Sequence, residues 1–213
     1  MSVAAHAYAL VEVAGEQTAA HGRSVAELAG AVADELGLDA AACQELELAA
    51  LLHDIGKSAI PDEILQKPSA LTVEERSLIE THTAQGESIV AGAEESLAGI
   101  ARIVRTSHER WDGTGYPDGL AGHSIPLAAR VVFCCDSYDA MTTDRPYRKA
   151  MSHAGAVSEL WAGAGSQFDP IVVAAVARVL YAQQRSGGQR RAGRQVAPVR
   201  GRRAQLASVP ATS

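Results

Sequence analysis

Apolar residues in this chain recur at the spacing of a helix, and this periodicity constrains its fold more than any other feature. One stripe follows the i, i+3, i+4, i+7, i+11 pattern of a helix face and consists of Val25, Leu28, Ala29, Val32 and Leu36. Alanine is abundant and runs of β-branched residues are scarce, which also favours helix. The chain shows no alternation of strand and helix patterns. We therefore predict an all-α domain of six or more helices.

Start and stop signals mark where these helices begin and end. Thr72 and Glu75 fit a capping box that opens one continuous helix over residues 72–90. Asp169 and Pro170 fit an N-cap followed by a first-turn proline. The Gly-, Pro- and Asp-rich stretch 109–126 predicts an ordered loop. The other expected helices are one that ends near Gly37, one over 43–54, one from about 97 to 108, one over 127–142 and a last one from 170 to about 182.

The end of the chain differs in charge from the rest. From Ala182 onward there are seven arginines and no acidic residue, which leaves 12 basic and 25 acidic residues in the preceding part. We predict a folded domain over residues 1–181 and a basic, disordered tail over 182–213. Two interpretations of the tail stay open. It binds nucleic acid or another anionic surface, or it is a solvated arm that contacts only its own acidic domain.

The expected cellular location of the protein follows from targeting and membrane signals that the sequence does not contain. No segment approaches the roughly 20 apolar residues that cross a bilayer, and the N-terminus has no basic region of the kind that opens a signal peptide. The cysteines are odd in number and lack disulfide spacing, which is typical of a reducing compartment. Cys134 and Cys135 could be vicinal thiols for metal or redox chemistry, but we favour small buried helix residues. We predict a cytoplasmic protein with no membrane span.

Four histidines, His21, His53, His82 and His108, lie on or at the ends of four different predicted helices. In the sequence LLHDIGK, Asp54 follows His53, so that an apolar helix ends in a charged pair. Burying an unpaired carboxylate is costly, and a bound cation would remove that cost.

A carboxylate between neutral imidazoles suits two divalent first-row metals. Such metals, ~3.5–4 Å apart, lower the pKa of a shared water and clamp the oxygens of an in-line phosphoryl displacement. We take Asp54 as the candidate bridge. Lys57 lies one turn after it and would hold a phosphate oxygen as a point charge. The alternative is a surface lysine, and inside this motif we favour the functional interpretation.

Several further motifs accompany the His-Asp pair, and the loop DGTGYP and the later DRPYR are far more specific than that pair. The full set is His21, HDIGK (53–57), His82, HERWDGTGYPDGL (108–120) and Asp136 within CCDSYDAMTTDRPYR. Taken together, these motifs resemble the HD-GYP family, a branch of the HD phosphohydrolases whose members degrade the bacterial second messenger cyclic di-GMP. The resemblance covers about residues 15–180 and implies an HD-domain helical bundle with an ordered GYP loop.

This resemblance also implies a metal-ligand set, with Fe or Mn as the expected metals. One ion would be held by His21, His53 and Asp136, and the other by His82 and His108, with Asp54 between them.

The resemblance implies substrate contacts as well. Tyr116 in the GYP turn would contact the ligand near a guanine or a phosphate. Arg145 and Arg148 would hold phosphate or guanine, whereas the residues alone would suggest an ordinary solvated pair. Asp54 and Lys57 would be the catalytic residues.

Two positions depart from the family pattern. Many members have two consecutive histidines where this chain has Ser107 and His108, and a hydroxyl is a much poorer ligand than an imidazole. Some members place a Glu of a third metal site where this chain has Gln17. We therefore predict two metals and not three, with a weaker second site as an open alternative.

The leading hypothesis is a phosphodiesterase that hydrolyses cyclic di-GMP to pGpG and/or GMP. A second hypothesis is an HD phosphohydrolase for another nucleotide. A third is a non-catalytic module that binds a nucleotide or a partner, and only Ser107 supports it. Family members commonly carry a regulatory domain ahead of the catalytic part, and His21 comes too early for one here. Three alternatives stay open: a fragment of a longer chain, a stand-alone enzyme, or an enzyme regulated by a separate partner in trans.

Overall fold

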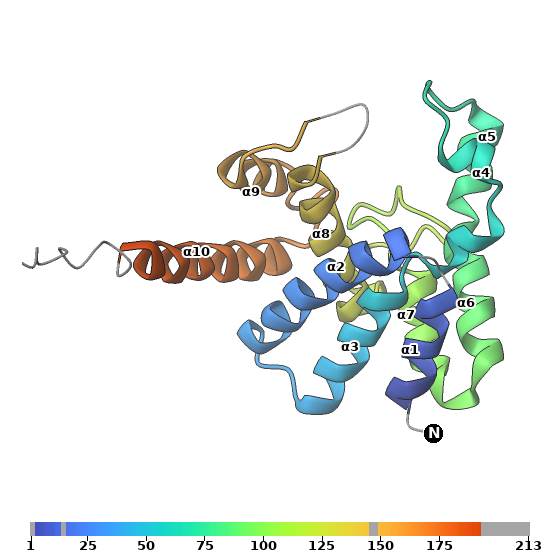
Figure 1. The fold of residues 1–213 in the computed structure, drawn as a ribbon, viewed down its shortest axis with the longest axis horizontal. Coiled ribbons are helices and arrows are strands. Elements are labelled where there is room, and N and C mark those ends of the chain that lie inside the picture. Colours follow the sequence, from blue (N-terminus) through green and yellow to red (C-terminus); the bar gives the residue numbers. More distant parts are fainter. Residues whose placement is uncertain (1–2, 14–15, 145–148, 193–213) are drawn as a thin grey trace, which may run out of the picture. The chain divides into compact units, whose positions relative to one another are not determined.

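The structure, a computed structural model, describes residues 3–13, 16–144 and 149–192. The chain divides into two compact units, Met1–Leu180 and Tyr181–Ser213. The described ranges contain no strand apart from one isolated bridge, so the predicted all-α class is confirmed. The α-helices in Figure 1 are α1 (Val3–Val13), α2 (Glu16–Glu35), α3 (Ala40–Leu52), α4 (Asp62–Leu65), α5 (Val73–Glu80), α6 (His82–Ala93), α7 (Ala98–Arg105), α8 (Leu127–Thr142), α9 (His153–Ala162) and α10 (Pro170–Ala192). Short 3-10 helices are η1 (Ile55–Ala59), η2 (Glu95–Leu97) and η3 (Gly122–Ser124).

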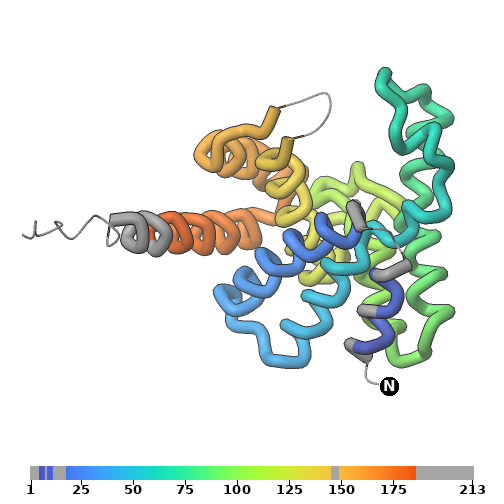
Figure 2. The backbone as a smooth tube through the Cα atoms, viewed as in Figure 1, coloured from blue at the N-terminus to red at the C-terminus, as the bar shows by residue number. Residues whose placement is uncertain are grey.

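Two helix hairpins form the frame of the first unit. In Figure 2 the chain turns back from α2 into α3, and further on from α6 into α7. Helix α3 packs on α2, α7 and α8, and α2 also packs on α8. Helix α6 packs on α7 and on η1, the short segment that follows α3. This packing brings α3, which precedes η1, together with α2, α7 and α8.

The apolar stripe predicted on α2 does face the core. Val25, Ala29 and Val32 are fully buried, and they share one core cluster with Leu46 and Leu52 of α3. Burying a leucine side chain completely contributes roughly 1.5–3 kcal/mol, so this packing fixes the α2–α3 hairpin. No described helix has both the length and the apolar character needed to cross a bilayer.

The adjacent cysteines of α8 belong to the same core. Cys134 and Cys135 are both fully buried. Burial also raises the pKa of both thiols, which keeps them protonated and unreactive. The structure therefore agrees with their interpretation as small core residues.

Several predicted helix ends are confirmed by hydrogen bonds. The Thr72 hydroxyl accepts from the Glu75 N–H (3.2 Å), and the Glu75 carboxylate accepts from the Thr72 N–H (2.8 Å), which completes the capping box. Asp169 accepts from the Ile171 N–H (2.8 Å), and α10 begins at Pro170 as expected. Gly37 has a positive φ of 71°, which lets the chain leave α2.

The structure differs from the sequence-based prediction over residues 72–90, where we expected one continuous helix. Helix α5 ends at Glu80 and α6 starts at His82. The hydroxyl of Thr81 donates to the Leu78 carbonyl (2.7 Å), a back-bond that competes with the helical ladder and bends helices. The interruption places His82 directly after a helix end.

The last helix also runs further than expected. Helix α10 continues to Ala192, past residue 182, where we placed the start of the tail. The division of the chain into residues 1–181 and 182–213 stays a prediction, and residues 193–213 lie outside the described residues.

Two glycines beside the predicted ligands allow backbones to approach closely. A Cβ at Gly22, next to His21, would lie 2.5 Å from the Leu51 carbonyl oxygen of α3. A Cβ at Gly56, two residues after Asp54, would lie 1.9 Å from the His82 carbonyl oxygen of α6. Both contacts are with backbone, which cannot rotate away. Glycine at these positions thus sets the spacing between the elements that carry the site.

We predict that Gly56→Ala lowers the free energy of unfolding by about 3 kcal/mol or more, because either η1 or α6 must shift to admit the methyl group. Gly92→Ala is the matched control, since a Cβ at Gly92 in α6 meets no atom within 4 Å. The free energy of unfolding of Gly92→Ala should differ from that of the unchanged chain by no more than about 1 kcal/mol. Urea unfolding of both variants measures the difference, and equal midpoints would show that the close approach is not needed.

Candidate metal centre

All six residues predicted as metal ligands lie close together in the structure. They form two groups, and within each group the ligand atoms lie within 4.8 Å of one another. Both groups have the composition that the family pattern implied. The first comprises His21 of α2, His53 at the C-cap of α3 and Asp136 of α8, and the second comprises Asp54 before η1, His82 at the start of α6 and His108 after α7.

Asp54 lies between the two groups. Its Oδ1 is 3.5 Å from His53 Nε2 and 3.6 Å from His82 Nε2. Its Oδ2 is 3.8 Å from His21 Nε2. Oδ1 therefore faces one histidine of each group and Oδ2 faces His21, which places the carboxylate between the two groups.

Four polar atoms of the site are buried and have no hydrogen-bond partner among the described residues. They are His53 Nε2, Asp54 Oδ1, His82 Nε2 and His108 Nε2. An unsatisfied buried polar atom costs about 1–3 kcal/mol, so four of them in one place are expensive for the protein alone. Cations coordinated by these atoms would remove the cost, and imidazole with carboxylate suits divalent first-row metals. The donor set thus fits the metal ions that the sequence predicts.

The histidine tautomers agree with that role. The Nδ1–H of His53 donates to the Ala50 carbonyl (2.7 Å), and the Nδ1–H of His82 donates to the Ile79 carbonyl (2.8 Å). A neutral imidazole that donates through Nδ1 carries its lone pair on Nε2. Both rings therefore direct an acceptor nitrogen into the site.

The ionisable groups of the site differ in the direction in which their pKa values are shifted. Burial lowers the pKa of His108 to about 3 and also lowers the pKa of His82, which keeps both rings neutral. Burial alone would raise the pKa of Asp54, but the neighbouring His53 and Lys57 outweigh burial and hold that pKa well below its usual range. The site therefore holds the ionised Asp54 carboxylate beside the neutral rings of His82 and His108.

His21 behaves differently from His82 and His108. Burial lowers its pKa, but hydrogen bonds from its ring to Asp136 and Asp139 outweigh burial and raise the pKa to about 10. Without bound metal, this ring is an imidazolium between two carboxylates.

Lys57, predicted as a phosphate-binding residue, points at the site. Its Nζ lies 2.6 Å from Asp54 Oδ2 and donates a hydrogen bond to it. The side chain is about one third exposed, so the ammonium group borders both the carboxylate and solvent. It therefore lies between the Asp54 carboxylate and solvent, and its role toward a substrate phosphate stays a prediction.

Tyr116 of the GYP loop lies over the second ligand group. Its ring stacks on His108 with centroids 5.2 Å apart and an interplanar angle of 10°, and it meets the His82 ring edge-on at 6.2 Å. Burial raises the pKa of its phenol, which therefore stays protonated. The tyrosine thus packs against the second ligand group, and its contact with a ligand stays a prediction.

Hydrogen bonds to acidic side chains hold the GYP loop in place. The buried Glu109 carboxylate accepts from the Asp118 N–H (2.7 Å) and the Leu120 N–H (3.0 Å). Arg105 at the end of α7 donates to both oxygens of Asp118 (2.8 and 2.7 Å) and to Glu87 of α6 (2.8 Å). The loop is thereby tied to the two helices that carry His82 and His108.

The positions that departed from the family pattern are only partly described. The hydroxyl of Ser107 donates to the Val104 carbonyl (2.8 Å), so its hydrogen is used at its own helix end. The side chain of Gln17 lies outside the described residues, and so do Arg145 and Arg148. The roles predicted for the two arginines stay predictions.

Sequence reasoning missed two acidic residues that support the site. Glu109 directly follows His108, and its role in the loop could not be read without knowing how the loop folds back. Asp139 contacts His21 through the ring nitrogen that faces away from the ligand groups. Its spacing of three residues from Asp136 on one helix was a usable signal, because such residues share a face.

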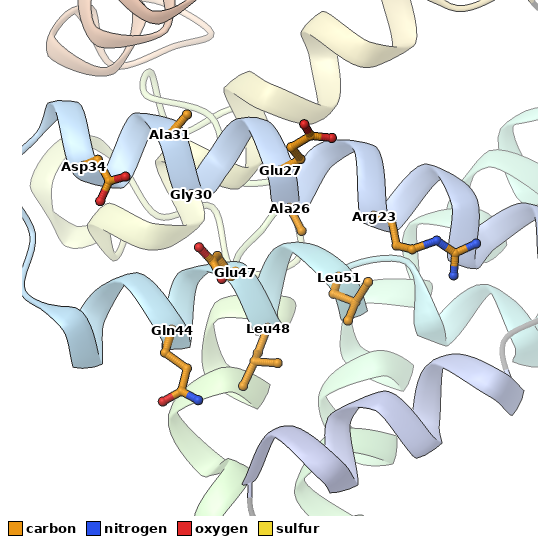
Figure 3. A pocket seen from close by; sticks show the side chains of 10 residues that line it. All are labelled: Arg23, Ala26, Glu27, Gly30, Ala31, Asp34, Gln44, Glu47, Leu48 and Leu51. Carbon is orange, nitrogen blue, oxygen red and sulfur yellow. The ribbon is translucent and has the colours of Figure 1, made fainter.

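A separate cavity of about 500 Å³ opens between α2 and α3 (Figure 3). Its charged lining comes from Arg23, Glu27, Asp34 and Glu47. None of the six predicted metal ligands lines it. The convergent histidines therefore mark the candidate site, and this cavity does not.

Comparisons with known proteins agree with this geometry. A family model described as an HD domain matches residues 7–172. The chain belongs to the HD domain family. It is 41% identical over 162 residues to the cyclic di-GMP phosphodiesterase response regulator RpfG of Xanthomonas campestris. The aligned residues make up 76% of this chain and 43% of that protein. It is 35% identical over 164 residues to the 3'3'-cGAMP-specific phosphodiesterase 2 of Vibrio cholerae. The aligned residues make up 76% of this chain and 31% of that protein.

A solved structure supports the same assignment. The HDG"Y"P protein Bd1817 from Bdellovibrio bacteriovorus matches with a TM-score of 0.64 and 25% identity, over 77% of this chain and 52% of that chain. The predicted HD-GYP type is therefore confirmed. This HD-GYP chain spans less than half the length of the curated relatives described above.

In the metal-free protein, we predict that two site histidines do not titrate between pH 5.5 and 8. His21 stays protonated because its pKa is about 10, and His108 stays neutral because its pKa is about 3. Long-range 1H–15N spectra recorded against pH measure both states, and asparagine variants of each histidine assign the signals. A midpoint between pH 6 and 7 for either ring would contradict the described surroundings.

We further predict that Glu109→Gln destabilises the protein by about 1–3 kcal/mol, because the new amide group would face a backbone N–H that now donates to a carboxylate oxygen. Urea unfolding measures the change, and limited proteolysis reports on loop 109–126. Glu95→Gln, at an exposed position in η2, is the control and should leave both readouts unchanged.

Proposed function

We propose that this HD-GYP domain is a metal-dependent phosphodiesterase that hydrolyses cyclic di-GMP to pGpG and/or GMP. The observation that carries the proposal is the set of four buried ligand atoms near the GYP loop that have no hydrogen-bond partner in the part of the chain that the structure describes. The proposed metal ligands are His21, His53, Asp54, His82, His108 and Asp136, holding two divalent ions, with Fe or Mn preferred.

When bound, such ions supply Lewis acidity, which activates water and neutralises charge on phosphoryl oxygens. The protein's own side chains supply the rest. Asp54 would be the carboxylate shared between the two ions, and Lys57 would hold a substrate phosphate oxygen by charge. Tyr116 packs against a base or sugar of the substrate, since its ring already forms a wall of the site. We also propose phosphate or guanine contacts for Arg145 and Arg148, in keeping with the family pattern.

Cyclic di-GMP is the preferred substrate because relatives named as its phosphodiesterases reach 41% identity. A specific observation favours a second candidate, 3'3'-cGAMP, since the relative specific for that compound is 35% identical. Both are cyclic dinucleotides with the same phosphodiester ring, so one site chemistry serves either. The predicted location, a regulatory partner in trans and binding by the arginine-rich tail stay predictions.

Incubating the Mn- or Fe-loaded protein with each cyclic dinucleotide, and separating the products by chromatography, tests the proposal. We expect turnover of cyclic di-GMP and at least about 100-fold less in Asp54→Asn, which keeps the shape but loses the bridging charge. Asp34→Asn, at an exposed site on α2, is the matched control and should retain activity. Faster turnover of 3'3'-cGAMP would transfer the assignment to that substrate, and binding without turnover would indicate a non-catalytic module.

Metal content gives a second and independent test. We predict two ions per chain after anaerobic purification, because the ligand atoms form two groups and Ser107 is turned to its own helix. Elemental analysis measures the ratio of metal to protein. Three tightly held ions per chain would contradict the prediction.

A further inference from the structure

The site histidines are held in place by two different means. His53 and His82 each donate Nδ1–H to a carbonyl three residues earlier, Ala50 and Ile79 respectively. These carbonyls belong to the last turns of α3 and α5, where backbone oxygens lack a partner within the helix. The backbone at a helix end therefore orients both rings.

His21 is not held in this way. It lies inside α2, five residues after the helix begins at Glu16 and well before it ends at Glu35. Carbonyls within a helix already accept from the N–H four residues on. The partner of the His21 Nδ1 atom lies instead on a different helix.

That partner is Asp139 of α8. Its Oδ2 lies 2.8 Å from His21 Nδ1, and its Oδ1 accepts from the Ser24 hydroxyl at 2.5 Å. Asp139 is part-buried in this contact, and both of its oxygens are engaged. Ser24 lies one turn after His21 on α2, so the carboxylate is clamped between two residues of the same helix face.

The opposite edge of the His21 ring faces the ligand groups. Its Nε2 is 3.0 Å from Asp136 Oδ1 and 3.8 Å from Asp54 Oδ2. Asp136 and Asp139 lie three residues apart on α8, and each meets one nitrogen of the same imidazole. Asp136 belongs to a ligand group, whereas Asp139 does not.

We propose that Asp139 is a positioning residue that fixes the orientation and tautomer of His21, so that Nε2 is presented to a metal ion in the group with His53 and Asp136. The inference rests on the proposed metal site. A carboxylate behind a ligating histidine orients the ring and makes it a better ligand, and its loss typically costs about 10–100-fold in metal affinity. Asp139 should therefore affect the binding affinity for one of the two ions and not for the other.

The test compares metal binding by Asp139→Asn with that of the unchanged chain. Asparagine keeps the size of the side chain but removes its charge. Metal-free protein is titrated with Mn²⁺ against a chelator, which yields a dissociation constant for each ion. We expect about 10–100-fold weaker binding of one ion and an unchanged constant for the other. Ser24→Ala should weaken the same ion by a smaller factor, because it removes only the group that steadies Asp139.

Glu35→Gln is the matched control. It makes the same carboxylate-to-amide change at another contact of α2, where Arg178 Nε of α10 donates to Glu35 Oε1 at 2.5 Å. The dissociation constants of both metal ions should be unchanged in this variant. The visible absorption of the Co²⁺-loaded protein gives a second readout, and its bands should shift in Asp139→Asn but not in Glu35→Gln.

His21→Ala separates failure of the inference from failure of the metal site. If His21→Ala weakens one ion and Asp139→Asn leaves both unchanged, the positioning role is overturned and the metal site stands. If His21→Ala changes neither constant, the proposed metal site itself is wrong. Equal weakening of both ions in Asp139→Asn, with a lower unfolding midpoint of the metal-free protein, would show a general structural role and would also overturn the inference.

Discussion

The buried carboxylate of Asp54 is the constraint on which the rest of this structure depends. An ionised acid in the interior is unfavourable unless opposite charge or hydrogen-bond donors surround it. Here one oxygen faces Lys57 and His21, while the other faces the Nε2 atoms of His53 and His82 without a hydrogen bond. The protein alone leaves this arrangement unsatisfied, and cations would complete it. The packing of the surrounding helices can be understood as the framework that holds Asp54 in that position.

Helix ends provide most of that framework. His53, His82 and His108 follow the ends of α3, α5 and α7, where free carbonyls can orient an imidazole and the chain can change direction. Glycines at 22 and 56 let neighbouring backbones come close enough for these ends to meet. His21 and Asp136 lie instead within α2 and α8 and close the site from the other side. The site therefore combines three helix ends with two helix faces.

The GYP loop adds a second layer to the site. It is specific to this branch of the family, and it covers the group formed by Asp54, His82 and His108. Its own carboxylates are used for internal order, since Asp112 accepts from the Thr114 N–H (3.0 Å) and Glu109 accepts from two loop amides. Loops that carry function need such fixed points, because they lack the repeating hydrogen bonds of helices. Tyr116 is thereby held against His108 before any substrate arrives.

Much of this protein could be predicted from its sequence. Helical periodicity, the Thr72 capping box and the Asp169–Pro170 pair are local signals, and the structure confirms each of them. The candidate ligands could be named because His-Asp at the end of an apolar helix is unusual chemistry, and the GYP motif pointed to a family. The break at Thr81 was missed because a threonine back-bond and a regular helix have the same local pattern. The extent of the last helix was also not visible, since its final turns carry the composition of a tail.

By itself, the sequence determined which elements are helical, which residues carry metal-binding chemistry and which family the chain resembles. Only the tertiary structure decided which way each imidazole points and which atoms face one another across the site. It also revealed that Asp139 and Glu109 support the site. The physical reason is distance along the chain, because His21 and Asp139 are separated by 118 residues and meet only when α2 packs on α8. Local propensity specifies each helix, but contacts of this kind exist only once the helices have packed.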